Sequence, residues 1–279
     1  MDQIETAASP ASMHDFVPLP SLPLDRIICG DNCEVMRKLP SESIDLVVTS
    51  PPYDNLRTYG GHTWDFEGVA QQLWRVIKPG GVVVWVVADA TVNGSETGTS
   101  FRQALRFMEI GFRLHDTMIY RKVGGGAVGS HKCYWDGWEF MFVLSNGEPK
   151  AINRLKDKPN STAGTFRSPT RKNNEVGTRV QKERIEIADF SVRQNVWDYM
   201  TGVFNRDDNT KHPAPFPEAL ARDHILSWSN EGDIVLDPFA GSGTTGVACK
   251  LEGRKAVLIE ISEAYCESAA KRLSQGVLF

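Results

Sequence analysis

The feature that most constrains the fold is a glycine-rich stretch near the C-terminus, DPFAGSGTTG at residues 237–246. It leaves an apolar run at 233–238 and enters a helical pattern at 243–253, so its glycines allow a tight turn and close approach to a ligand. It also matches the dinucleotide pattern G-x-G-x-x-G, with Glu260 ending the next apolar run. In a dinucleotide fold, however, this turn follows the first strand, whereas here one strand and one helix complete the chain at Phe279. The other strands must come from the N-terminal half, and the sequence predicts a rearranged α/β sheet.

Short apolar runs alternate with helical patterns along most of the chain, which is typical of an α/β fold with a mainly parallel sheet. The run VVVWVVA at 82–88 is apolar on both faces, as a central parallel strand would be. The helical pattern before it is broken by Lys78-Pro79-Gly80-Gly81. The other expected strands are 26–30, 44–50, 112–121, 138–145, 233–238 and 255–261, and the expected longer helices are 65–77, 100–110, 216–228, 243–253 and 264–273.

Length and composition are those of a globular protein. The 279 residues, 41% hydrophobic and 24% charged, suit one large α/β domain or two small ones. The longest apolar run is too short to span a bilayer. Residues 1–24 have early acids, several prolines and no signal-peptide pattern, so we expect a flexible or surface-wrapped arm. The five scattered cysteines indicate a reducing, cytoplasmic compartment, and we expect no metal site at Cys29 and Cys33.

The charge of the chain is unevenly distributed. Residues 150–184 hold ten Lys/Arg and three Asp/Glu, or 10 − 3 = +7, whereas the whole chain carries −4, which leaves −4 − 7 = −11 elsewhere. A basic island in an acidic protein favours a polyanionic partner, although a solvated basic loop gives the same count. Periodicity is weak from 123 to 195, where we expect an irregular basic insertion.

A second unusual stretch is VVTSPPYDN at 47–55, which ends an apolar run. Two successive prolines fix the backbone and remove two donors, which leaves carbonyl groups free to accept hydrogen bonds. In the rearranged sheet, the C-terminal ends of the 44–49 and 233–237 strands come together, which places this stretch beside the glycine turn at a topological switch point. Taken alone, SPPY is equally consistent with a rigid turn that caps a strand.

TSPPY followed later by DPFAGSGTT resembles the S-adenosylmethionine-dependent amino-methyltransferases of DNA, and this order of motifs resembles their permuted β class. The likeness covers residues 24–150 and 195–275. It implies a Rossmann-like methyltransferase fold, α/β with a mixed or parallel sheet, circularly permuted. Residues 25–122 and 196–279 would then form the catalytic and cofactor-binding domain, and 123–195 would be an inserted target-recognition region.

The resemblance also implies a site for S-adenosyl-L-methionine, residue by residue. Asp31 would meet the adenine, Glu260 would bind the ribose, and Phe239 would pack on the cofactor. Asp237 would face the methionine amino group, and KHPAPFP at 211–217 resembles the element that walls the methionine end. The expected cofactor residues are Asp31, Lys211, His212, Pro213, Asp237, Phe239, Gly241, Ser242, Gly243, Thr244, Thr245 and Glu260.

The same resemblance makes Ser50, Pro51, Pro52 and Tyr53 the catalytic residues. An exocyclic amine of a base is a poor nucleophile because its lone pair is delocalised into the ring. The Ser50 hydroxyl and the Pro51 carbonyl would accept from its two hydrogens and favour a pyramidal nitrogen. Tyr53 offers a stacking face for a base extruded from the duplex. Residues 138–140 resemble the segment that supports the base pocket.

The target base stays open at this point. Adenine-N6 members of the family mostly carry Asp at the Ser50 position, and cytosine-N4 members more often carry Ser, so the residue favours N4-cytosine slightly. Carbon-5 methylation of cytosine is disfavoured, because it needs a Pro-Cys dipeptide that the sequence lacks. The alternatives are an RNA or protein amino-methyltransferase, a DNA-binding regulator without catalysis and, least favoured, an NAD-dependent dehydrogenase.

Double-stranded DNA is the expected partner, and the resemblance suggests a homodimer. A cognate restriction endonuclease is left open. His131, Tyr134 and Trp135 are candidates to gate the base pocket, with ordinary packing as the alternative for Trp135. Basic residues would contact phosphates or base edges. The expected DNA-binding residues are Arg57, Arg154, Lys156, Lys158, Arg167, Arg171, Lys172, Arg179, Lys182 and Arg184.

Overall fold

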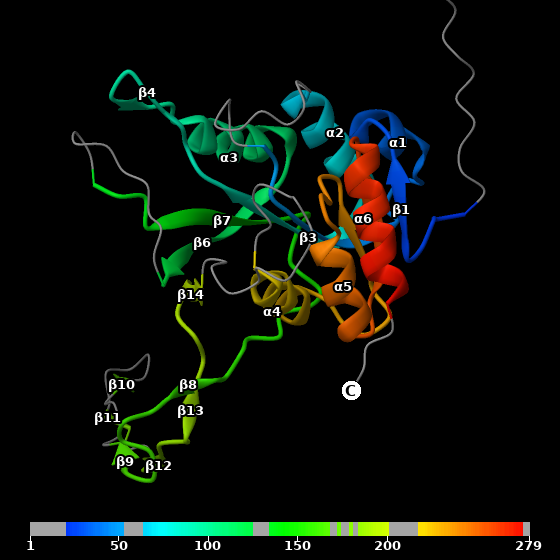
Figure 1. Cartoon of the computed structure of the whole chain (residues 1–279). Helices are drawn as coiled ribbons and strands as arrows, with labels where there is room; N and C mark the ends of the chain where they lie inside the picture. The colour runs from blue at the N-terminus through cyan, green and yellow to red at the C-terminus, as the bar shows by residue number, and fades with distance from the viewer. Residues whose placement is uncertain are drawn as a thin grey trace, which may run out of the picture.

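A mixed sheet of eight strands organises the molecule, with helices on both faces (Figure 1). The computed structural model describes residues 21–52, 64–124, 134–167, 172–173, 179–180, 184–200 and 217–275.

The sheet is parallel except for one strand. β7 runs antiparallel to both of its neighbours, β3 and β6, and β14 pairs parallel with β6 at the edge. The expected central parallel strand is therefore parallel to β2 on one side and antiparallel to β7 on the other. In spatial order the strands are β1 (Arg26–Cys29), β16 (Lys255–Glu260), β15 (Ile234–Asp237), β2 (Ile44–Thr49), β3 (Ile77–Val87), β7 (Trp138–Ser145), β6 (Arg113–Val123) and β14 (Val196–Met200).

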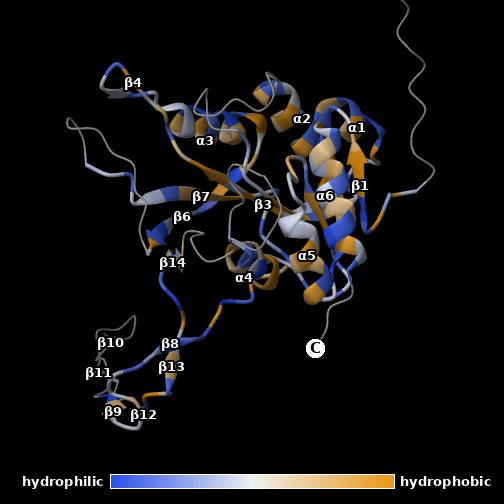
Figure 2. Cartoon of the chain, viewed as in Figure 1, coloured by the Kyte–Doolittle hydropathy of each residue, from blue (hydrophilic) through white to orange (hydrophobic). Residues whose placement is uncertain are grey.

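Two apolar cores lie on the two faces of this sheet, and β3 contributes to both. Its side chains alternate, with Val83 and Trp85 in one core and Val82 and Val84 in the other, as the two-residue period of a strand requires. Figure 2 shows apolar residues on strands of the sheet such as β1 and on the helices that flank the sheet. No helix in the described part of the chain is long and apolar enough to cross a membrane. The first core is covered by α1 (Asn32–Lys38), α2 (Phe66–Val76) and α3 (Thr99–Ile110), and the second by α4 (Glu218–Trp228), α5 (Thr244–Leu251) and α6 (Glu263–Ser274).

The expected meeting of two distant strands is confirmed. β15 and β2 are parallel neighbours, with Val235 beside Leu46 and Leu236 beside Val47. The helix after β15 covers one face of the sheet and the helix after β2 covers the other. A crevice forms where connections diverge in this way, so the carboxyl ends of β2 and β15 mark the switch point of the sheet.

β3 begins earlier than the sequence predicts. Helix α2 ends at Val76, and the strand starts at Ile77 instead of residue 82. A Cβ on Gly81 would lie 2.8 Å from Ile77 Cγ1, and Gly80 has φ +81°. The β2–β3 register shifts at this point. The glycines therefore produce an irregularity within the strand, where the sequence suggested a break before it.

The range 123–195 is not one excursion from the sheet, because β7 within it is a central strand. The range contains the β6–β7 hairpin end and a two-stranded ribbon that returns to β14 (Figure 1). We call residues 157–193 the ribbon arm. Its order differs from the irregular structure expected. The paired segments are β8 (Lys158–Pro159) with β13 (Phe190–Ser191), β9 (Phe166–Arg167) with β12 (Ile185–Glu186), and β10 (Lys172–Asn173) with β11 (Arg179–Val180); a separate small hairpin joins β4 (Thr91–Val92) to β5 (Ser95–Glu96).

Candidate active site at the switch point of the sheet

A buried hydrogen-bond network joins the two motifs. The Thr49 hydroxyl, at the end of β2, donates to Asp237 Oδ1 over 2.6 Å, and the Thr245 hydroxyl, in α5, donates to Asp237 Oδ2 over 2.6 Å. The Phe239 amide also donates to Asp237 Oδ1, over 3.1 Å. Ser50 follows Thr49 directly, so the network fixes the start of SPPY against the glycine turn.

Asp237 is enclosed by these donors and is only 1% exposed. Burial raises the pKa of its carboxyl to about 6, although the hydrogen bonds from Thr245 and Thr49 act in the opposite direction. Its carboxyl group therefore links β2, β15 and α5 through hydrogen bonds. The expected contact with a methionine amino group stays a prediction.

The glycine turn enters α5 through Gly243, which has φ +83° and caps the helix. A Cβ on Gly243 would lie 3.0 Å from Ala269 Cβ, so both conformation and space favour glycine. Arg272 of α6 holds the turn from behind, since its Nη1 donates to Ser242 O over 2.9 Å and to Ser242 Oγ over 3.0 Å. The same guanidinium lies 3.7 Å from Glu218 at the start of α4.

Glu260 lies beside the turn, at the end of β16. Its Oε2 accepts from the Gly241 amide and its Oε1 from the Ser262 amide, each over 2.9 Å. A carboxylate has about four acceptor positions, so hydroxyl groups can still donate to it. Asp31 occupies the neighbouring strand end, where its Oδ1 accepts from the Glu34 amide over 2.9 Å and caps α1.

An aromatic cluster adjoins the turn through Phe239. The rings of Trp64 and Phe239 meet edge to face with centroids 5.0 Å apart, and Trp85 lies 6.3 Å from Phe239. Trp85 Nε1 donates to Gln103 Oε1 over 2.9 Å, which fixes its ring. The sequence interpretation gave no role to Trp64, Thr49 or Arg272. Thr49 stands within TSPPY, but the motif does not show that its partner is Asp237, and no motif or spacing marks Trp64 or Arg272.

The base-pocket residues are partly described. Pro51 is buried and Ser50 is half-buried, whereas Tyr53 and His131 lie outside the described residues. Phe140 pairs with Val87, so the start of β7 reaches the edge at which β2 and β3 end. Trp138 packs edge-on against Phe140 with centroids 4.7 Å apart. Tyr134 and Trp135 are described and exposed.

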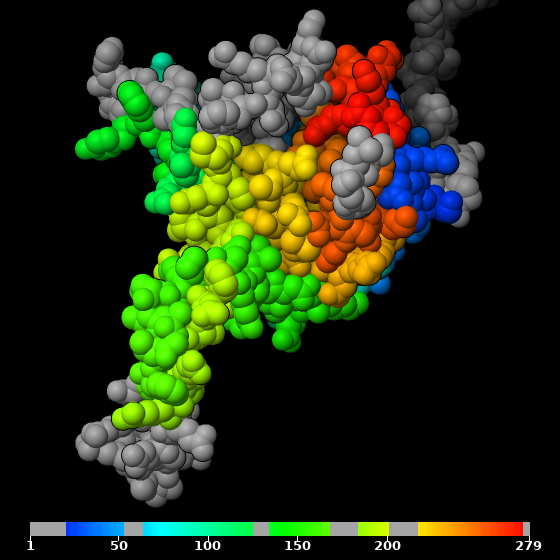
Figure 3. Space-filling view, turned by 60° about the horizontal axis from the view of Figure 1, so that its bottom comes forward, coloured from blue at the N-terminus to red at the C-terminus, as the bar shows by residue number. Residues whose placement is uncertain are grey.

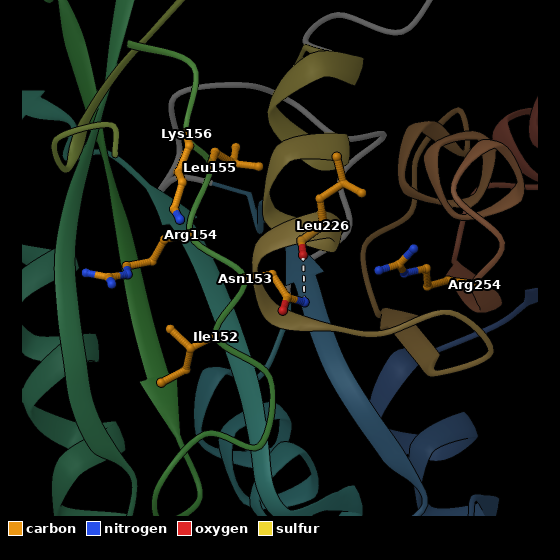
Figure 4. A pocket seen from close by; sticks show the side chains of 7 residues that line it. All are labelled: Ile152, Asn153, Arg154, Leu155, Lys156, Leu226 and Arg254. Atoms are coloured by element: carbon orange, nitrogen blue, oxygen red, sulfur yellow. Dashed lines mark hydrogen bonds between the residues drawn. The ribbon is translucent and has the colours of Figure 1, made fainter. Parts of the chain in front are cut away.

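The expected DNA-binding residues lie in two places. Lys158, Arg167 and Arg184 are exposed on the ribbon arm. Arg154 and Lys156 instead border an open groove of about 640 Å³ that also includes Leu226 and Arg254 (Figure 4). Asn153 attaches this segment to the C-terminal end of α4, so the groove lies at the opposite end of α4 from the glycine turn. The side chains of Lys172 and Arg179, and all of Arg57, Arg171, Lys182, Lys211, His212 and Pro213, lie outside the described structure.

The arrangement suits S-adenosylmethionine. The acceptors of Glu260, the glycine turn and the aromatic edge of Phe239 lie at one edge of the sheet, and their donor and acceptor chemistry matches ribose hydroxyls and an adenine ring. A family model described as DNA methylase matches residues 44–271. The chain belongs to this family. S-adenosyl-L-methionine is accordingly the cofactor of this DNA methyltransferase.

Two curated relatives are methyltransferases, and one of them is named for adenine. The methyltransferase is 49% identical over 242 residues to the orphan methyltransferase M.BamHII of Bacillus amyloliquefaciens, covering 85% of this chain and 91% of that one. It is 30% identical over 260 residues to the DNA adenine methyltransferase YhdJ of Escherichia coli (strain K12), covering 88% and 82%.

Solved structures share the fold. The cytosine-N4-specific PvuII DNA methyltransferase superposes with a TM-score of 0.64 at 22% identity, over 91% of this chain and 87% of that one. The complex of M1.HpyAVI with its cofactor superposes with a TM-score of 0.59 at 24% identity, over 90% and 99%. The expected Rossmann-like methyltransferase fold is confirmed, and the dehydrogenase interpretation is wrong for this DNA methyltransferase.

Proposed function

We propose that this DNA methyltransferase transfers a methyl group to the N4 amino group of a cytosine extruded from double-stranded DNA. The observation that carries the proposal is the Thr49–Asp237 hydrogen bond of 2.6 Å, which fixes the start of SPPY beside the cofactor turn. N6-adenine is the second candidate. The adenine methyltransferase named above supports it, whereas Ser50 and the fold of the cytosine-specific enzyme support cytosine.

The proposed mechanism depends on hydrogen-bond acceptors at the end of β2. The Ser50 hydroxyl and the Pro51 carbonyl accept from the two amino hydrogens of the base, which turns the nitrogen lone pair toward the methyl donor. S-adenosylmethionine supplies a methyl group already activated on a sulfonium. The nitrogen–methyl bond forms as the sulfur–methyl bond breaks, and the nitrogen then releases one proton to solvent. The protein mainly supplies alignment and local electrostatics.

Nucleoside mass spectrometry tests this function. The protein is incubated with cofactor that carries a heavy methyl group and with unmethylated bacterial DNA, and the DNA is then digested. Heavy N4-methylcytosine is the expected product. Heavy N6-methyladenine would identify the second candidate, and label recovered only in RNA or protein would contradict the assignment to DNA. The Ser50→Ala variant separates catalysis from binding, because a non-catalytic DNA binder would be unaffected by it.

We infer also that two copies associate through α3. Phe101, Leu105 and Met108 recur at helical spacing and are exposed on this helix. Arg102 lies near its start and Glu109 near its end, so an antiparallel, two-fold pairing of α3 with itself places opposite charges together. Leu105→Glu should shift the protein to a monomer in analytical ultracentrifugation, and Glu267→Lys on α6 should not. A wild-type monomer at micromolar concentration would contradict the inference.

The relative named an orphan methyltransferase supports action without a restriction endonuclease. An extract of the host cell should therefore not cleave unmethylated DNA at the methylated sequence. Cleavage there would identify a paired nuclease instead.

A further inference from the structure

The described residues of the ribbon arm form no apolar core of their own. Phe166 is 59% exposed, Ile185 68% and Phe190 53%. Its described pairs are two residues long, and an isolated two-stranded ribbon is marginally stable in water. Figure 3 shows the arm extending away from the body of the molecule. Contacts at its root must therefore determine the direction in which it extends.

One arginine joins the two ends of the arm at that root. Arg193, in the segment between β13 and β14, donates from Nε to Asp157 Oδ1 over 2.7 Å and to Asp157 Oδ2 over 2.9 Å, and Nη2 also pairs with this carboxylate. Asp157 directly precedes β8, where the chain enters the arm. The Arg193 amide donates to Leu155 O over 3.0 Å, which closes the root through the backbone as well. Hydrogen bonds from Arg193 lower the pKa of Asp157 below its ordinary value.

The same guanidinium attaches the root to the body. Its Nη1 donates to Asp223 Oδ2 of α4 over 2.6 Å, and its Cζ lies 5.2 Å from the centroid of the Trp197 ring in β14. Tyr199 donates to Asp223 Oδ2 over 2.7 Å, which holds the carboxylate in place. Arg193, at the returning end of the arm, thus contacts the segment that enters the arm, helix α4 and the edge strand β14.

Helix α4 connects this junction to the cofactor site. Asp223 accepts from Arg193 in the middle of the helix, while Glu218 at its start lies 3.7 Å from Arg272. Arg272 in turn holds Ser242 of the glycine turn. A helix is rigid over this length. Helix α4 therefore holds the root of the arm at a fixed position relative to the glycine turn.

We propose that Arg193 is a positioning residue that fixes the ribbon arm relative to the active site and thereby selects the DNA sequence that is methylated. The inference rests on the proposed function in DNA. An arm that can pivot still attracts phosphates, because its basic residues remain. It no longer meets the same base edges while the target base is in the pocket, so discrimination falls while the chemical step is kept.

The test compares sequence selectivity in matched variants. Methylation of random-sequence duplexes by the wild type defines the preferred sequence, and kcat/KM is then measured for that duplex and for one altered by a single base pair. Arg193→Met should reduce the ratio of the two values about tenfold, through KM, with kcat and cofactor affinity within about twofold of wild type. Hydrogen exchange should accelerate at 155–160 and 187–195 and stay unchanged in β7.

Two further variants complete the design. Arg121→Met is the matched control. It removes the ion pair between Arg121 and Asp198, in which nitrogen and oxygen are 2.5 Å apart. This pair does not contact the arm, so the ratio should stay unchanged. Asp157→Asn weakens only the arm side of the junction and should lower the ratio even if Arg193→Met does not fold.

The outcomes separate the two claims. A selective wild type with equally selective, folded Arg193→Met and Asp157→Asn variants would overturn this inference alone, as would parallel losses of kcat and cofactor affinity. If the wild type methylates no duplex, the proposed function fails and this inference falls with it.

Discussion

The switch-point edge and the ribbon arm of this methyltransferase are held together by opposite means. At the edge, Asp237 is buried and receives donors from both motifs. In the arm, apolar side chains are exposed, and an ionic junction at Arg193 provides the attachment. A buried, fully satisfied network specifies one geometry at the edge, whereas the arm depends for its direction on the partly buried Arg193–Asp223 pair, whose side chains are 26% and 15% exposed. The comparison separates an edge aligned by a buried carboxylate from an arm aligned at its root by one arginine.

The largest effect should come from the catalytic serine. Ser50→Ala removes one acceptor for the amine and should lower kcat about 100- to 1,000-fold, as loss of one preorganised hydrogen-bonding group does elsewhere. Cofactor affinity and the melting temperature should change little, because Ser50 is half-buried at the end of β2. Single-turnover kinetics provide the measurement, with Ser95→Ala on the exposed β5 as control. A kcat within threefold of wild type would remove Ser50 from the mechanism.

The next effect sharpens the comparison through pH. The pKa of Asp237 is raised to about 6 in the folded protein, chiefly by burial, from an ordinary value of 3.8. Its contribution to stability is therefore fully present below pH 4 and is lost as the pH rises through 6. Relative to Asp237→Asn, the wild type should lose about 2.5 kcal/mol of unfolding free energy between pH 4 and 7. If the unfolding free energies of the wild type and Asp237→Asn, measured in urea, differ by the same amount at every pH, burial of the ionised carboxylate does not lower stability.

A smaller loss is expected from the hydroxyl groups around Asp237. Thr49→Val keeps the shape of the side chain but removes a donor, and should cost about 1–3 kcal/mol of unfolding free energy. Thr245→Val should act similarly, and the double variant should be non-additive because both groups serve one carboxylate. Thr91→Val, exposed on β4, is the control. If Thr49→Val, Thr245→Val and the double variant all unfold at the same urea concentration as the wild type, the hydrogen bonds to Asp237 do not stabilise this edge of the sheet.

The smallest effect should come from the arm. Arg167→Ala and Arg184→Ala should leave the unfolding free energy unchanged and weaken DNA binding at every sequence alike. Each should reduce the slope of log affinity against log salt by about one, if it removes one phosphate contact. Fluorescence anisotropy at several salt concentrations measures this. An unchanged slope in both variants would place the DNA path elsewhere on the protein.

Much of the fold was accessible from sequence pattern. The run at 44–50 and the glycine turn each identified a strand end, and the late position of the turn required a rearranged sheet in which these ends meet. The 138–145 strand was also recognised by its apolar residues. Its place between β3 and β6 could not be recognised, because strand pairing depends on contacts between distant residues, which the local alternation of apolar residues does not show. The ribbon arm escaped notice for another reason, since pairs of two residues are too short for alternation to be detected.

The candidate site divides in the same way. The motif residues Ser50, Asp237 and Glu260 are found by their letters, because a turn or a carboxylate at a strand end has a local sequence requirement. The residues that hold these motif residues in place cannot be found in this way. Thr49 lies 188 residues from its partner Asp237, and Arg272 lies 30 residues from Ser242. Trp64 meets Phe239 only through the packing of β2, α2 and β15.

The sequence by itself indicated the methyltransferase class and the cofactor through the resemblance of TSPPY and DPFAGSGTT to a known family, and the order of the elements through its apolar runs. Only the tertiary structure decided what holds those residues in place and how the basic segment is mounted. Hydrogen bonds such as Thr49–Asp237 and ion pairs such as Arg193–Asp223 join elements remote in the chain. Their existence depends on where the folded backbone brings two side chains within bonding distance, and one-dimensional spacing does not contain that information.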